Sequence, residues 1–172
     1  MRGRENGFTL TELLMVTAVI GIALTLGAAA FNRYWKVRSL TGAIDEVVTE
    51  LRAEQQDAST RTHPSVWGAW FKQGTSRWGV VRGDAETGTC VVKSRRTLPT
   101  SVTISAAAFD DVTTPALSAN CAAAAETGSE VVLFFARGSA TGGSVSLAHP
   151  QVGGGSPRTI TVTPITGKVT RP

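Results

Sequence analysis

The chain has 172 residues, so it has room for one globular domain of ordinary size, which excludes a multidomain enzyme. Only 17% of its residues are charged. Its formal net charge of +4 is modest and the signs are mixed along the chain, so charge alone does not indicate a nucleic-acid-binding protein. Because Ala, Gly, Thr, Ser and Val are plentiful, we expect a body that is mostly β rather than a helical bundle.

An uncharged apolar run of eighteen residues, Leu13 to Ala30, lies close to the N-terminus. With Phe31 it approaches the length that a helix needs to cross a bilayer, about 20 residues. Arg2 and Arg4 precede the run, and cations are typical of the cytoplasmic flank of a membrane helix. The pattern predicts a single-pass helix with its N-terminus in the cytoplasm and the rest of the chain outside. Three cations on the far side weaken this charge asymmetry: Arg33, Lys36 and Arg38.

Beyond the apolar run, apolar residues recur at spacings of three and four, the period of an amphipathic helix. Most of the charged residues fall on the opposite face. Thr60, His63 and Pro64 mark the end of this pattern. We expect the outer half of one long helix here, packed on the following domain through a stripe of Val37, Leu40, Ile44, Val47 and Leu51.

From Pro64 onward the period becomes that of strands. Two of them, Ser65 to Phe71 and Arg77 to Arg82, flank a turn that contains a glycine, which predicts a hairpin. The spacing predicts an antiparallel meander. Ala106 to Gly128 is less regular and is interpreted as a long loop, with or without a helical turn, tied down by Cys121. The remaining predicted strands are Thr89 to Lys93, Ser101 to Ser105, Glu130 to Ala136, Ser144 to Ala148, Thr159 to Thr163 and Lys168 to Thr170.

The two cysteines, Cys90 and Cys121, both lie in the part predicted to be outside the cytoplasm. An even number of cysteines in such a compartment usually indicates a disulfide. We predict a bond between them, and closing this loop would stabilise the fold by roughly 3 to 4 kcal/mol on the chain-entropy model. The alternative is a pair of buried free thiols.

The junction Gly7-Phe8-Thr9-Leu10-Thr11-Glu12, followed at once by the apolar run, resembles the class III signal of type IV pilins and type II secretion pseudopilins. In that family a prepilin peptidase cuts after the glycine and methylates the new N-terminal residue. The resemblance implies cleavage between Gly7 and Phe8 and N-methylation of Phe8. Such a cut keeps the apolar run, whereas ordinary signal peptidase discards it. The alternative is an ordinary signal anchor in which Gly7 and Glu12 are incidental.

Glu12 would be the fifth residue of the mature protein, at the edge of an otherwise uncharged span. An ionisable group near hydrocarbon is costly unless it finds a partner. The resemblance implies that this partner is the α-amino group of Phe8 in a neighbouring subunit, a pairing that sets the register of assembly. A rival hypothesis is a binding module that uses the helix only as a tether, without a filament.

The domain after Pro64 is similar to the GspH/FimT group of minor pilins and pseudopilins. The segments that carry this similarity are Phe134 to Ala140, Gly143 to Leu147 and Arg158 to Val169. The resemblance implies an α+β fold in which a long N-terminal helix, with a membrane-spanning first half, packs on a small antiparallel β-sheet domain. The organisation would be a leader over residues 1–7, a transmembrane and filament-core helix over 8–31, its outer half over 32–63 and the β-rich domain over 64–172.

The implied function is that of a minor pilin or pseudopilin which joins, primes or caps a type IV pilus or type II secretion pseudopilus. Prepilin peptidase and other pilin or pseudopilin subunits would be its partners. The protein would lie first in the cytoplasmic membrane and then in the filament.

Some members of this group that are linked to DNA uptake bind DNA through a Gly-Arg-x-Arg tail. The counterpart here is Gly167 to Arg171, in which Lys168 replaces the first arginine and the two cations are separated by two positions. The resemblance gives an alternative function, DNA binding for natural transformation, with weak and salt-sensitive contacts from Lys168 and Arg171 and help from Arg158. The other interpretation of this tail is a solvated strand end.

No nucleophile motif, phosphate-binding loop or dinucleotide fingerprint is present, so we expect neither an enzyme nor a cofactor. His63 and His149 precede prolines, and no spacing around them indicates a metal site. Trp67 and Trp70 are three residues apart and should face opposite sides of a strand, so we interpret them and Trp78 as packing residues rather than a binding platform.

Overall fold

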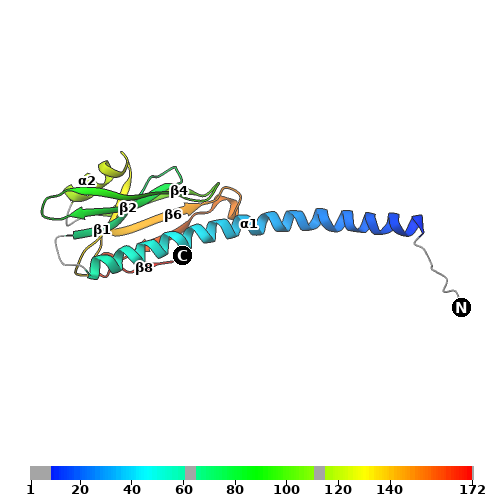
Figure 1. Cartoon of the computed structure of the whole chain (residues 1–172), viewed down its shortest axis with the longest axis horizontal. Coiled ribbons are helices and arrows are strands. Elements are labelled where there is room, and N and C mark those ends of the chain that lie inside the picture. Colours follow the sequence, from blue (N-terminus) through cyan, green and yellow to red (C-terminus); the bar gives the residue numbers. More distant parts are fainter. Residues whose placement is uncertain (1–8, 61–64, 111–114, 172) are drawn as a thin grey trace. The chain divides into compact units, whose positions relative to one another are not determined.

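The structure, a computed structural model, describes residues 9–60, 65–110 and 115–171. It divides into two compact units, residues 1–36 and residues 37–172 (Figure 1). In the first unit the described residues from Leu10 onward form one continuous helix, the beginning of α1 (Leu10–Thr60). The predicted long helix is therefore confirmed. It ends at Thr60 as expected, whereas His63 and Pro64 lie outside the described residues.

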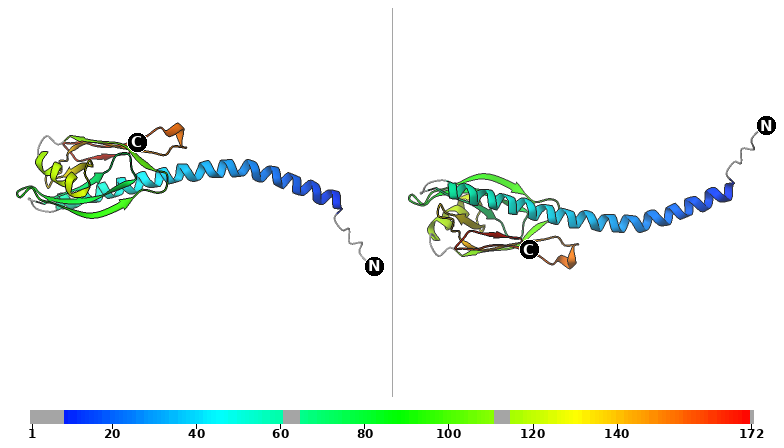
Figure 2. Two further views of the ribbon diagram at one scale, coloured as in Figure 1. Left: turned by 90° about the horizontal axis from the view of Figure 1, so that it is seen from above. Right: turned by 90° about the horizontal axis from the view of Figure 1, so that it is seen from below.

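The second unit holds two four-stranded antiparallel sheets. The first sheet has the order β3-β2-β1-β5 and the second has the order β4-β6-β7-β8. Figure 2 shows the two sheets and α1 from opposite sides. The first sheet consists of β1 (Ser65–Phe71), β2 (Arg77–Asp84), β3 (Cys90–Thr97) and β5 (Glu130–Phe134). The second consists of β4 (Thr103–Asp110), β6 (Gly142–Ala148), β7 (Arg158–Val162) and β8 (Val169–Thr170), with a short 3-10 helix η1 (Gly153–Gly155) between β6 and β7.

The α+β prediction is confirmed, but the predicted meander is wrong. After β3 the chain leaves the first sheet to begin the second with β4, and β5 later returns to pair with β1, Phe71 lying opposite Glu130. The turn between β1 and β2 links the sheets, because the Ile104 N–H donates to the Thr75 carbonyl over 2.8 Å. The spacing of the strands along the sequence predicts where each strand lies, but it does not predict which distant strand pairs with a given edge strand.

The loop predicted for Ala106 to Gly128 is also wrong. Its first residues extend β4 to Asp110, and helix α2 (Pro115–Ala125) spans eleven residues rather than a single turn. The helix has a local cause. Proline is well tolerated in the first turn of a helix, where its missing N–H is not needed, and alanine has the highest helix propensity, so the alanine run favours α2.

Two apolar cores explain this arrangement. The larger lies between residues 40–58 of α1, one face of the first sheet and the second sheet, and it contains Trp67 and Trp78. The smaller lies between the other face of the first sheet and α2, and it contains Trp70 and Cys121. Because both faces of the first sheet are covered, six of the seven residues of β1 are buried in succession. The packing interpretation of the three tryptophans is confirmed.

Candidate functional site

The amino-terminal half of α1 begins with a cap on the first helical turn. The Thr9 side-chain oxygen accepts a hydrogen bond from the Glu12 backbone N–H at 3.3 Å, and the Thr9 carbonyl accepts one from the Leu13 N–H at 3.2 Å. Glu12 stands in this first turn, where a negative charge interacts favourably with the helix dipole. The sequence pattern Thr-x-x-Glu is typical of such a capped helix start.

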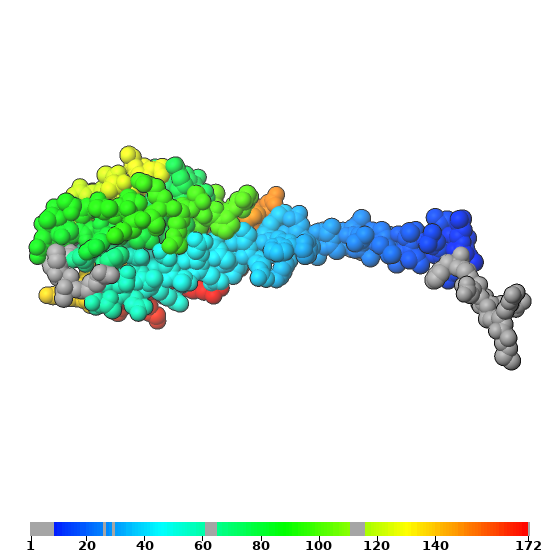
Figure 3. Space-filling view, in the orientation of Figure 1, coloured from blue at the N-terminus to red at the C-terminus, as the bar shows by residue number. Residues whose placement is uncertain are grey.

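Beyond Glu12 the helix presents an apolar surface on every side. The described side chains from Leu10 to Phe31 are all exposed, and Met15 and Leu10 reach 75% and 77% exposure. Figure 3 shows the atoms of this stretch in blue. Among the described residues it is the single helix whose length and composition would suffice to cross a membrane. The predicted span from Leu13 to Ala30 thus lies on one unbroken helix.

The polar groups inside this span are satisfied by the helix itself. The Thr17 hydroxyl donates to the Leu14 carbonyl over 3.0 Å, and the Thr25 hydroxyl donates to the Ile22 carbonyl over 2.8 Å. Neither hydroxyl therefore needs water or a partner helix. Glu12 is the one charged residue between Thr9 and Asn32, so it is the residue of this stretch that needs a charged partner when the helix is surrounded by apolar groups. Gly7 and Phe8, the predicted cleavage site, lie outside the described residues.

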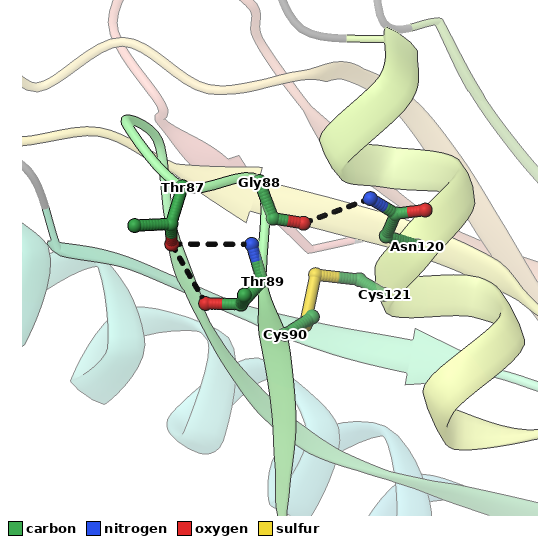
Figure 4. Close-up of a disulfide and its surroundings, with 6 residues drawn as sticks. All are labelled: Thr87, Gly88, Thr89, Cys90, Asn120 and Cys121. Carbon is green, nitrogen blue, oxygen red and sulfur yellow. Dashed lines mark hydrogen bonds between the residues drawn. A yellow bond between two sulfur atoms is a disulfide. The ribbon is translucent and has the colours of Figure 1, made fainter.

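A disulfide joins Cys90, at the start of β3, to Cys121 on α2, with the two Cα atoms 5.0 Å apart (Figure 4). The predicted pairing is therefore present. One residue away, the Asn120 side-chain amide donates to the Gly88 carbonyl over 2.8 Å, so two neighbouring links attach α2 to the β2–β3 turn and to the start of β3. Cys121 is fully buried in the smaller core. These contacts hold α2 against the first sheet.

The basic residues at the C-terminal end differ in their surroundings. Lys168 and Arg158 are exposed, while the Arg171 guanidinium lies 3.1 Å from a carboxylate oxygen of Asp45 on α1. β8 comprises only Val169 and Thr170, and the buried Val169 side chain fixes which face of the strand points inward. Arg171 therefore has a neighbouring anion within the same unit, and a ligand phosphate would compete with it for that guanidinium.

Sequence reasoning missed an ion cluster between α1 and β3. The Arg96 guanidinium lies 2.7 Å from Glu50 and 3.9 Å from Glu46, and it lies over the ring of Trp78, 5.5 Å from the centroid. One helical turn beyond Glu50, Glu54 is only 7% exposed. The helical period could have revealed it, because Glu54 continues the buried stripe of Val47, Leu51 and Ala58, although most charges of this segment were expected on the opposite face.

The pKa of Glu54 is raised from 4.5 to about 7. Burial is the largest cause, the nearby Glu50 and Asp57 carboxylates act in the same direction, and the cations Arg96 and Lys93 oppose the shift. One of its carboxylate oxygens, Oε2, is buried without a hydrogen-bond partner. This group therefore favours the protonated form in the folded domain.

The histidines offer no metal site among the described residues. His149 is buried, and its Nδ1 accepts a hydrogen bond from the Gln151 N–H at 3.2 Å, so it acts as a turn residue. No group of three or more His, Cys, Asp or Glu side chains in ranges 9–60, 65–110 and 115–171 could hold a metal ion. His63 lies outside these ranges.

Comparison with known proteins gives one family match. Residues 2–28 match the model of the prokaryotic N-terminal methylation motif. No curated protein and no solved structure matches the chain significantly. The matched segment contains the Gly7–Phe8 junction, Glu12 and most of the exposed apolar helix. The match indicates a type IV pilin-like protein that prepilin peptidase processes and that assembles with other pilins.

Proposed function

We propose that this chain is a minor pilin or pseudopilin that joins, primes or caps a type IV pilus or type II secretion pseudopilus, and that it acts as a structural subunit rather than as an enzyme. One observation carries this proposal. The methylation motif over residues 2–28 coincides with a helix whose described side chains are exposed and almost entirely apolar. Such a surface has to be covered, either by lipid or by the equivalent helices of other subunits.

Glu12 gives this assembly surface its specificity. The Thr17 and Thr25 hydroxyls are satisfied within the helix, so each copy brings one charged group to an otherwise apolar interface. A carboxylate in hydrocarbon is costly alone and favourable beside an ammonium group. We therefore propose that Glu12 pairs with the α-amino group of Phe8 in an adjacent subunit, and that only the axial offset which brings them together is stable.

The test compares Glu12→Ala with Glu46→Ala, a carboxylate on the part of α1 that packs on the sheets. Processed protein should accumulate in the membrane with both variants, but only Glu12→Ala should fall at least tenfold in the sheared filament fraction, measured by immunoblot. Unchanged incorporation of Glu12→Ala would show that this carboxylate has no role in assembly, and absence of the parent protein from the filament fraction would support the tether hypothesis.

The assignment to minor pilins of the GspH/FimT group rests on the domain. A helix packed against two antiparallel sheets is what the sequence resemblance to that group implies, and the Phe135–Ser139 turn is closed by a 2.9 Å bond from the Phe135 N–H to the Ser139 carbonyl. A minor subunit should be present at far fewer copies than the major one. Quantitative mass spectrometry of purified filaments measures this ratio, and near-equal copy numbers would contradict the minor role.

DNA binding by the C-terminal cations is the second candidate. It is favoured by the exposure of Lys168 and Arg158, whereas the Asp45–Arg171 contact of 3.1 Å opposes it. Two or three phosphate contacts would give micromolar or weaker affinity that falls as salt rises. A mobility-shift titration at two salt concentrations should compare the Lys168→Ala, Arg171→Ala double variant with an Arg137→Ala control. Equal binding by parent and double variant would remove the tail from consideration.

A further inference from the structure

An aromatic cluster lies directly after the apolar run of α1. Phe31, Tyr34 and Trp35 are spaced at three and four residues, which places them on one face of the helix. The Trp35 ring meets Phe31 edge-on with centroids 5.7 Å apart, and it meets Tyr34 at 6.3 Å. All three remain exposed, at 61%, 55% and 53% respectively. The rings therefore pack on one another, yet about half of each surface faces outward.

Three cations accompany these rings. Arg33, Lys36 and Arg38 fall within six residues, and the first acidic residue after them is Asp45. Arg33 and Arg38 are exposed and Lys36 is half-buried. On the helical wheel Arg33 and Lys36 lie away from the rings, so cations and rings together surround the helix. The segment from Phe31 to Arg38 is hereafter the belt.

The position of the belt matches the thickness of a bilayer. At about 1.5 Å per residue, the helix from Leu10 to Phe31 is about 31 Å long, close to the roughly 30 Å of a hydrocarbon core. With Leu10 at one boundary, the belt reaches the other boundary at the depth of the headgroups. Tryptophan and tyrosine are enriched at that depth because one edge of the ring is apolar and the other is polar.

We propose that the belt binds the anionic phospholipid headgroups of the membrane face from which the β domain extends, and so holds the unassembled subunit at a fixed depth. This inference rests on the proposed membrane insertion. Charge selects the occupant. A second copy in parallel would bring an identical cationic segment alongside, whereas anionic headgroups complement it. Each Lys or Arg of a polybasic segment that lies near an anionic membrane surface raises the association constant for that surface about fivefold.

Quenching of Trp35 by brominated lipids tests this inference on the full-length protein in vesicles. The other three tryptophans are buried, and Trp35→Phe measures their background. Bromines at headgroup-proximal positions should quench Trp35 more than bromines near the bilayer centre. Brominated phosphatidylglycerol diluted into phosphatidylcholine should quench several-fold more than brominated phosphatidylcholine in the same host.

The charge variant is Arg33→Gln, Lys36→Gln, Arg38→Gln, and Arg137→Gln is the matched control on an exposed loop of the domain. The triple variant should lose the preference for phosphatidylglycerol, while the control keeps it. Equal quenching by both lipids in the parent protein would overturn the inference. Weak quenching at every depth, together with a Trp35 emission that shifts when the protein is diluted, would also overturn it, because the rings would then pack against a second copy of the chain.

Carbonate extraction of the same vesicles distinguishes a failure of lipid binding by the belt from a failure of the proposed membrane anchoring. Protein that resists extraction yet shows no lipid preference overturns the belt alone. Protein that carbonate extracts overturns the proposed membrane anchoring, and the belt with it.

Discussion

Replacing Glu54 with glutamine should stabilise the folded domain at neutral pH. Glu54 is 7% exposed on the face of α1 that packs on the sheets, and burial raises its pKa to about 7 with the help of Glu50 and Asp57, against Arg96 and Lys93. Glutamine keeps the size of the side chain and cannot ionise. The variant therefore removes the cost of an unpaired buried charge without opening a cavity.

The sign and size follow from proton linkage. The folded domain holds the Glu54 proton more tightly than the unfolded chain, whose carboxyl has a pKa near 4.5, so stability falls as the pH rises from 4.5 to about 7 and stays low above that. The full difference corresponds to roughly 3 kcal/mol. Partial solvent screening of the site reduces this to about 2 kcal/mol.

Urea unfolding of the compact unit, residues 37–172, measures the effect at pH 5 and pH 8. Parent and Glu54→Gln should differ little at pH 5, and the variant should be more stable by about 2 kcal/mol at pH 8. Glu130→Gln, at an exposed position on β5, should show no such pH dependence. A Glu54→Gln variant that is less stable at pH 8 would refute the reasoning, because the carboxylate would then be stabilised by its cationic neighbours.

Two further stability predictions follow from the second unit. Replacing both Cys90 and Cys121 with alanine should lower the free energy of unfolding by about 4 kcal/mol, because the opened loop gains entropy in the unfolded chain. Urea midpoints of the parent protein with and without reductant measure the same effect independently. Identical midpoints would contradict the stabilising role of the disulfide. Gly68→Ala should destabilise by more than about 3 kcal/mol or prevent folding, because the added Cβ would lie 2.0 Å from the Val132 carbonyl oxygen. The matched control is Gly42→Ala, in the helix, where an added Cβ would have nothing within 4 Å, and it should stabilise the domain by about 0.5–1 kcal/mol. Equal effects of the two substitutions would show that the contact with the Val132 carbonyl does not cause the destabilisation of Gly68→Ala.

Local patterns predicted most of the elements. β1 has the predicted bounds, Ser65–Phe71, because Pro64 precedes it in the sequence and a turn that contains a glycine follows it. The disulfide followed from compartment and cysteine count. The apolar span and the end of α1 at Thr60 followed from composition and period. These features depend on residues that are neighbours in sequence, or on constraints that hold for the whole chain.

The features that sequence reasoning missed depend on distant contacts. The pairing of β5 with β1 joins strands that are far apart in sequence, and the cover that α2 gives one face of the first sheet depends on its packing there and on Cys121. The position of Glu54 beside Arg96 depends on the distance between α1 and β3, which no local pattern encodes. The contact between Arg171 and Asp45 joins residues at opposite ends of the domain sequence.

The mass of the N-terminal peptide of the protein recovered from its native membrane shows most directly whether the chain is processed as a pilin. We expect a mature chain that begins at Phe8, carries one methyl group on its α-amino nitrogen and retains the whole apolar run to Phe31. A chain that still begins at Met1, or one cut beyond residue 31, would contradict it.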